Sequence, residues 1–483
     1  MASPAQVTTK TAGVAAPPLA TSQTTAFGHL LFALAALAAL MSSIDYTIVA
    51  VAIPQLVVSF DTSLALVAWT LTAYQLVQLI MLPLSGKLSD SFGRKRVFLF
   101  CVGIFTFGSL LCAIAPNIWF LIVARGVQAV GGGGLVPSSV GIVAEHYPLR
   151  RAQAIGLLTS MQPIGSIIGP NLGGFILEHW TWREMFIINV PIGAAVVVGV
   201  GLILHERRVQ RAARHIDVPG LALYGSAITL LLLSLTAAGD DPSLWHGPFV
   251  WLGLGVSVAL FVAFLRWIKR AADPVMEYRL VAQRPYVAVN IYNLLFGAAV
   301  FGFFSFLPTY AVLVFGLDPF LSGAVLTPRA IVMVITSILT SVYIIKLGYR
   351  IPMLLGMALV AVMLVILGQA QTQVQVGPVS FGGFWFLASV LLLSAVGNGL
   401  STPSSSNAAI DMAPDRAAAL TGIRNMFRLT GGVISIAAMV VALTLFSDQA
   451  LGLATIFGWL AVPILLAAPL AFAIPDAPRR KRD

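Results

Sequence analysis

The feature that most constrains this chain is a recurring apolar segment about twenty residues long, enough for a helix to cross a hydrocarbon core ~30 Å thick. Of the 483 residues, 58% are hydrophobic and only 10% are charged, whereas roughly 25% is typical of soluble domains. The sequence therefore predicts an all-α integral membrane protein with 14 transmembrane helices. The predicted helices are 30–54, 64–85, 97–115, 118–143, 152–176, 184–204, 219–238, 247–267, 287–312, 321–345, 352–369, 381–408, 417–445 and 452–474.

Basic residues are distributed unevenly over the loops between these segments. If the N-terminus lies in the cytosol, the loops on the opposite side of the membrane contain a single lysine or arginine, Arg183. An excess of basic residues on one side marks the cytosolic loops. We therefore expect a multi-pass plasma-membrane protein with both termini in the cytosol. The net charge of +10 then requires no nucleic-acid partner.

An internal repeat divides the chain into two halves. Residues 131–165 and 397–431 align without a gap, so that Glu145 matches Asp411. Repeats in the same orientation are one known plan for transporters, with the substrate site at the repeat interface. The predicted parts are a disordered cytosolic tail at 1–27, a six-helix bundle at 28–204, a linker with two inserted helices at 205–275, a second six-helix bundle at 276–475 and a basic cytosolic tail at 476–483.

Asp45 is an acidic residue in the interior of the first predicted helix. A carboxylate at that depth is costly, so it is usually protonated, paired or facing water. Arg125, in the fourth predicted helix, lies at a similar depth, so the two side chains could meet. A pair that opens and closes would load and release a proton. The alternative is a static ion pair that only orients the helices.

The first predicted cytosolic loop is rich in glycine and in charge. Gly86 and Gly93 allow a tight turn, and Asp90 can pair with Arg94 or cap a neighbouring helix. Together with Lys95, these residues would form a charge cluster that holds a gate in one state and then releases it. The alternative is a basic loop that only fixes the topology of the chain.

The fifth predicted helix has a face of small residues with a proline inside it. Gly165, Gly169 and Gly173 lie four residues apart, and Gly174 follows directly. Such a face lets another helix approach closely, and Pro170 bends its helix and frees a backbone carbonyl. Packing alone would also explain the glycines, because small residues are common at helix contacts in membrane bundles.

These stretches resemble motifs of a known family. The loop containing Asp90 is similar to the signature loop of the major facilitator superfamily, and the helix containing Pro170 is similar to the antiporter motif of that superfamily. The first helix resembles the first-helix motif of the fourteen-helix drug:proton antiporter branch, with Ala50 where that motif often has Asn. The residues that carry this second resemblance are Asp45, Thr47, Ile48, Ala52 and Pro54, and the stretch 182–193 also resembles that branch.

The resemblance implies a major facilitator fold, with two parallel six-helix bundles and two inserted helices. It also implies multidrug efflux in exchange for protons, with a role for Arg125 in the coupling. Independently of the resemblance, the only Gly-Lys pair in the chain lacks the first glycine of a phosphate loop, because Met81 stands there. We therefore expect no enzyme activity, no metal and no cofactor, and a proton gradient as the energy source.

A second group of residues is predicted to line a substrate site. Aromatic and amide side chains suit amphipathic ligands, and buried arginines could bind an anionic headgroup or take part in coupling. The alternatives are aromatic side chains in the core or against lipid, and arginines that bond helix-end carbonyls. The predicted substrate residues are Trp69, Tyr74, Gln78, Gln162, Tyr292, Asn293, Arg329, Arg424 and Arg428.

The function predicted from these features is proton-coupled export of hydrophobic or amphipathic small molecules across the plasma membrane by a monomer in contact with membrane lipids. One rival is an exporter of lipids or anionic metabolites on the same fold, because arginines outnumber acids among the predicted membrane segments. A second rival is a membrane sensor that does not transport.

Overall fold

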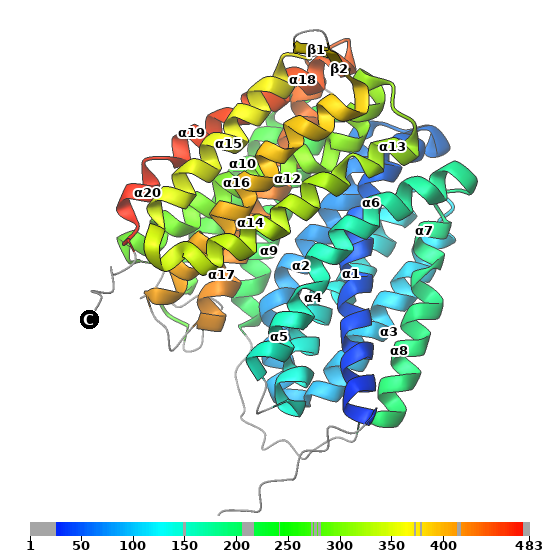
Figure 1. Ribbon diagram of the computed structural model, residues 1–483, viewed down its shortest axis with the longest axis vertical. Coiled ribbons are helices and arrows are strands. Elements are labelled where there is room, and N and C mark those ends of the chain that lie inside the picture. The colour runs from blue at the N-terminus through cyan, green and yellow to red at the C-terminus, as the bar shows by residue number, and fades with distance from the viewer. Residues whose placement is uncertain are drawn as a thin grey trace, which may run out of the picture.

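The computed structural model describes residues 26–147, 151–204, 217–240, 242–271, 274, 278, 282–370, 373–376, 379–412 and 417–476. Both predicted tails, 1–27 and 476–483, lie almost entirely outside these ranges. The described part of the chain is almost entirely helical, and its long helices run side by side (Figure 1).

The first half of the chain forms one helix bundle. Ser63 and Asn117 start two of its helices, because each side chain accepts a hydrogen bond from a backbone N–H in the first turn. Gly93, at φ 98°, makes the tight turn between α2 and α3. The helices are α1 (Ala26–Phe60), α2 (Leu64–Phe92), α3 (Arg94–Ala113), α4 (Ile118–His146), α5 (Arg151–Thr159), α6 (Met161–His179), α7 (Glu184–Ile187) and α8 (Asn189–Ile203).

The second half forms another bundle, and two further helices precede it. The inserted helices are α9 (Val218–Asp240) and α10 (Pro248–Trp267), joined by the short helix η2 (Pro242–His246). A short antiparallel hairpin of β1 (Gln373–Val376) and β2 (Val379–Gly382) adds two strands to the all-α prediction. The helices of the second bundle are α12 (Arg284–Phe315), α13 (Pro319–Ala324), α14 (Leu326–Leu347), α15 (Arg350–Gly368), α16 (Gly383–Asp411), α17 (Ala417–Leu443), α18 (Gln449–Trp459), α19 (Ala461–Ala467) and α20 (Leu470–Ala473).

Every one of the 14 predicted transmembrane segments is helical, and 13 helices of the described ranges are long and apolar enough to span a membrane. The remaining segment, 152–176, is divided into α5 and α6 at Ser160. Proline explains this break, because Pro163 has no N–H for the carbonyl four residues before it. Three other predicted segments break in the same way, each three residues before a proline, at Ile188, Val325 and Leu460.

Two helix bundles lean against each other in Figure 1. Helix α6 of the first bundle packs on α13 and α14 of the second, α1 packs on α12, and α2 packs on α17. The bundles diverge toward the end that carries α5. The inserted helices pack on each other, and α9 also contacts α2 and α17. Helix α9 therefore covers a seam where the two bundles meet.

Both bundles bury apolar side chains, and the core of the second bundle continues onto α2 and α9. Phe98 and Phe105 are fully buried in the first bundle, and Phe303 and Phe457 in the second. Large apolar side chains also point outward; Leu202, for example, is 76% exposed. In a membrane protein such side chains face lipid rather than water.

Candidate functional site

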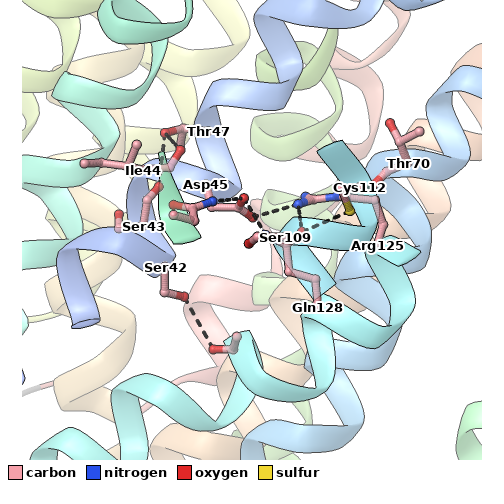
Figure 2. A network of polar contacts seen from close by, with 12 residues as sticks. Ser42, Ser43, Ile44, Asp45, Thr47, Thr70, Ser109, Cys112, Arg125 and Gln128 are labelled. Atoms are coloured by element: carbon pink, nitrogen blue, oxygen red, sulfur yellow. Dashed lines mark hydrogen bonds and ion pairs between the residues drawn. The ribbon is translucent and has the colours of Figure 1, made fainter. Parts of the chain in front are cut away.

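Asp45 is fully buried in α1, and both of its carboxylate oxygens accept hydrogen bonds (Figure 2). Arg125 of α4 donates from Nη1 to Oδ2 at 2.7 Å. Gln128, one turn further along α4, donates from Nε2 to Oδ1 at 2.7 Å and also to Ser109 Oγ at 2.7 Å. Asn189 of α8 donates to Oδ1 at 3.0 Å. One cation and two amides therefore surround this carboxylate.

Arg125 is also held by several hydrogen bonds and ring contacts besides its bond to Asp45. Its Nη1 also donates to Gln128 Oε1 at 2.5 Å, and its Nε donates to the backbone carbonyl of Thr70 at 3.1 Å. The guanidinium lies over the ring of Tyr74, 4.2 Å from the centroid, and 5.6 Å from the ring of Phe186. The network joins α1, α2, α3, α4 and α8, so a change in the charge of Asp45 would affect five helices.

Close helix packing brings these groups together. A Cβ on Gly108 of α3 would lie 2.5 Å from the backbone of Gln128, so only glycine allows α3 and α4 to approach at this point. The buried Ala50 of α1 stands where the first-helix motif of the drug:proton antiporter branch often has Asn. Here α4 and α8 supply the amides instead.

The predicted pair of Asp45 and Arg125 is in contact, and the sequence analysis missed both amides that complete the network. Gln128 follows Arg125 by three residues and therefore shares its helix face, a spacing that could have identified it. Asn189 lies within the stretch 182–193 that was already singled out, but no pattern in the sequence paired it with Asp45.

The predicted gating loop contacts its own bundle. Arg94 donates to the carbonyl of Gly141 at 2.6 Å and lies 3.6 Å from Glu145, both on α4. Lys95 donates to the carbonyl of Gly201 on α8 at 2.9 Å. Gly93 makes the turn described above. Gly86 and Asp90 belong to α2, but the side chain of Asp90 lies outside the described part of the structure.

The predicted antiporter motif on α6 faces two directions. On one side, Gly165 and Gly169 lie against Ser43 and Thr47 of α1, and Gly173 continues this face. Thr47 Oγ1 is also 3.5 Å from the carbonyl of Gly165. The small residues thus bring α6 within backbone distance of the helix that carries Asp45.

On its other side, α6 contacts the second bundle. A Cβ on Gly174 would overlap the α13 backbone, and Gly323 of α13 packs directly on the carbonyl of Pro170. Asn171 donates to Thr327 Oγ1 of α14 at 2.6 Å. Helix α6 therefore links the Asp45 helix to the second bundle.

The predicted substrate residues of the first bundle do not gather in one place. Trp69 donates to Thr236 of the inserted helix α9 at 2.7 Å. Tyr74 is fully buried against Arg125 and so belongs to the ion-pair network. Gln78 is half-buried on α2, and Gln162 is exposed near the start of α6.

Two predicted arginines of the second bundle lie one turn apart on α17. Arg424 donates to Asn293 Oδ1 of α12 at 3.3 Å. Arg428 donates to Asn398 Oδ1 at 2.8 Å and to Thr402 Oγ1 at 3.0 Å, both on α16. The structure therefore brings Arg424, Arg428 and Asn293 together where α12, α16 and α17 meet.

The other two predicted residues of this bundle are buried beside that group. Arg329 of α14 donates to Ser394 Oγ at 2.9 Å and lies 5.0 Å from the ring of Phe304. Tyr292 is fully buried and stacks on Phe296, with 5.8 Å between ring centroids.

The fold and the site define a class of protein, a multi-pass membrane protein of two packed helix bundles with an ion pair buried in one of them. Residues 35–436 match the Major Facilitator Superfamily, and the chain belongs to this superfamily. The match confirms the predicted fold class, and the family and the relatives described below indicate a transporter rather than an enzyme.

Two relatives show the similarity in more detail. The chain is 30% identical to the "Multidrug transporter protein MdtP" of Bacillus subtilis over 67% of its own length and 60% of that protein. It is 30% identical to the "Multidrug resistance protein B homolog" of Mycobacterium tuberculosis over 84% of its length and 75% of that protein. The predicted resemblance to transporters of the multidrug efflux type is thereby confirmed.

A solved structure has the same fold. It is a bacterial homologue of the human lysosomal transporter Spinster in an inward-facing and occupied conformation. The TM-score is 0.67 at 15% sequence identity, and the match covers 93% of this chain and 97% of that one. At this identity the likeness concerns the fold alone.

Proposed function

We propose that this chain is a proton-coupled exporter of hydrophobic or amphipathic small molecules, and that Asp45 carries the proton. The observation behind the proposal is the network around Asp45, a buried carboxylate in a membrane helix with Arg125 as its partner. Ionisable groups at such depth commonly serve ion pathways. The names of the relatives, a multidrug transporter and a multidrug resistance protein, support a small-molecule substrate.

In the proposed cycle, a proton from outside reaches Asp45 when the site opens outward. Protonation removes the negative charge that holds Arg125, so the ion pair weakens and α1 is freed to shift against α4. Helix α6 passes the shift on, because it packs on α1 and on α13. Residues 30–204 then rock against residues 287–474, and substrate binding inside favours release of the proton.

The proposed setting is the plasma membrane, with both termini in the cytosol and a monomer surrounded by lipid. The proton gradient supplies the energy, and no cofactor takes part. The unequal distribution of basic residues over the loops supports this orientation.

The test is efflux of a fluorescent amphiphile from everted vesicles, driven by a pH gradient. Asp45→Asn keeps the shape of the side chain but cannot ionise, so we expect it to lose gradient-driven efflux while still binding the amphiphile. The matched control is Asp318→Asn, because Asp318 is an exposed acid that caps α13 and Asn also caps helices. Unchanged efflux in Asp45→Asn at equal expression would exclude Asp45 as the coupling group.

A further inference from the structure

We propose that Arg424 and Arg428 form a binding site for an oxyanion headgroup, a carboxylate or a phosphate, on an apolar substrate. The inference deepens the proposed export function, on which it rests, by naming the class of substrate. Its evidence is separate from the Asp45 network, because both arginines and the groups to which they donate belong to the second bundle.

The neutral groups around Arg424 and Arg428 leave both guanidinium groups incompletely hydrogen-bonded. Arg424 donates to Asn293 and Ser405, each at 3.3 Å, and to Asn425 at 2.9 Å. Among the described residues, Arg428 donates to Asn398 and Thr402. The Nε of each arginine is buried without a hydrogen-bond partner. A guanidinium has more N–H groups than these contacts use, so both retain donors for a ligand.

The positive charges of Arg424 and Arg428 also favour an anionic ligand. Within the described ranges, neither Arg424 nor Arg428 forms an ion pair with a carboxylate, in contrast to Arg125 and Arg94. Arg428 also lies within electrostatic range of Arg424 and of the buried Arg329. Clustered buried cations are costly unless an anion compensates them. A ligand that carries its own oxyanion supplies that compensation, and its two oxygens match the fork of a guanidinium.

The surroundings of Arg428 suit the apolar or aromatic body of a ligand. The guanidinium lies 5.5 Å from the ring of Phe301 and 5.8 Å from the ring of Phe296, both on α12. Phe301 packs edge-on against Tyr46 of α1, with 6.4 Å between ring centroids. The guanidinium of Arg428 thus lies where the two bundles meet. Phe301 connects it to Tyr46, the residue that follows Asp45 in α1.

Accessibility also favours Arg428 as the first contact. Arg424 is only 4% exposed, whereas Arg428 is half-buried. A headgroup would therefore meet Arg428 first and engage Arg424, one turn away on the same face of α17, second.

The experiment uses the purified full chain in an uncharged detergent and three probes with the same apolar body. These are a fluorescent polyene fatty acid, its methyl ester and the corresponding alkyl phosphate. We expect the acid to bind about tenfold or more tightly than the ester, because hydrogen bonds to charged groups are strong. We also expect the acid, and not the ester, to raise the midpoint temperature of thermal unfolding of the wild type. This measurement does not depend on whether any variant folds.

The variants are Arg424→Gln and Arg428→Gln, with Arg428→Lys as the conservative change. Each glutamine variant should reduce the preference for the acid over the ester about tenfold, with unchanged affinity for the ester. Arg428→Lys should keep part of the preference. The matched control, Arg266→Gln, removes an exposed arginine of α10 and should change neither affinity.

Equal affinity of the wild type for acid and ester would overturn the inference, and so would a preference that survives both glutamine variants. Stronger binding of the alkyl phosphate than of the acid would support the site and assign it to phosphate headgroups such as those of lipids. The reverse order would support the site and assign it to carboxylates. Efflux of a neutral amphiphile driven by the gradient, without a preference for the acid, would refute only the oxyanion site. Preference for the acid without gradient-driven efflux would refute only the proposed coupling.

Discussion

The two bundles share a fold but handle buried charge in opposite ways. In the first bundle, Arg125 is neutralised by Asp45, and two amides complete the carboxylate's hydrogen bonds. In the second, Arg424 and Arg428 meet only neutral oxygens within the described ranges. A closed ion pair can change its charge by taking up a proton. A set of uncompensated cations cannot do so near neutral pH, but it can receive an anion. The comparison therefore supports the proposal that the first bundle couples protons and that the second binds the substrate.

The largest expected effect is the difference in unfolding free energy between variants of two buried arginines, Arg125 and Arg329. Arg125→Met leaves the buried carboxylate of Asp45 without its cation, so we expect a loss of about 3–5 kcal/mol in the free energy of unfolding. Arg329→Met removes an arginine whose Nε donates to the neutral Ser394, and we expect a change of about 1 kcal/mol or less. Denaturant unfolding in mixed micelles measures both.

A double variant sharpens this test. Asp45→Leu combined with Arg125→Met removes both charges, so its loss should be smaller than the sum of the two single losses. Equal losses in Arg125→Met and Arg329→Met would contradict the contrast between the bundles.

The next effect concerns the two amides that bond Asp45. Gln128→Leu removes a donor to Asp45 and Ser109 and an acceptor for Arg125, so we expect a loss of about 2–3 kcal/mol. Asn189→Leu removes one donor, and we expect about 1 kcal/mol. Gln153→Leu, at an exposed position of α5, is the control. If Asn189→Leu proved as costly as Gln128→Leu, the central place of Gln128 in the network would be wrong.

How much of the fold and of the candidate site could be predicted from the sequence depends on whether a feature arises from neighbouring residues or from segments far apart in the chain. The membrane-spanning helices and the family could be predicted because they depend on local composition and on short motifs. All the predicted helices are present for this reason. The pairing of Asp45 with Arg125 followed from two rare charges at similar depth. Asn189 could not be placed, because its contact depends on how α8 packs against α1. Trp69 looked like a substrate contact, but its partner, Thr236, lies on an inserted helix that no local pattern connects to it.

The smallest effects lie at corresponding ends of the two bundles, where the repeat matches Glu145 to Asp411. Arg94 forms a half-exposed ion pair with Glu145 at 3.6 Å, whereas the hydroxyl of Tyr349 donates to Asp411. We expect Arg94→Gln to cost about 0–1 kcal/mol, and less at high ionic strength, because salt screens an exposed pair. Tyr349→Phe should cost about 1 kcal/mol with little dependence on salt, because its donor is neutral.

The response to alkaline pH also distinguishes the Tyr349–Asp411 hydrogen bond from the Arg94–Glu145 ion pair. Burial and the nearby Asp411 raise the pKa of Tyr349 above its usual 10.0, so the folded state holds this proton more tightly than the unfolded state does. The contribution of Tyr349 is therefore complete below pH 10 and declines as the pH rises above it. The difference in unfolding free energy between wild type and Tyr349→Phe should narrow above that pH, while the difference for Arg94→Gln stays constant, since arginine keeps its charge. A Tyr349→Phe difference that does not change with pH would show that the hydroxyl is not held by Asp411.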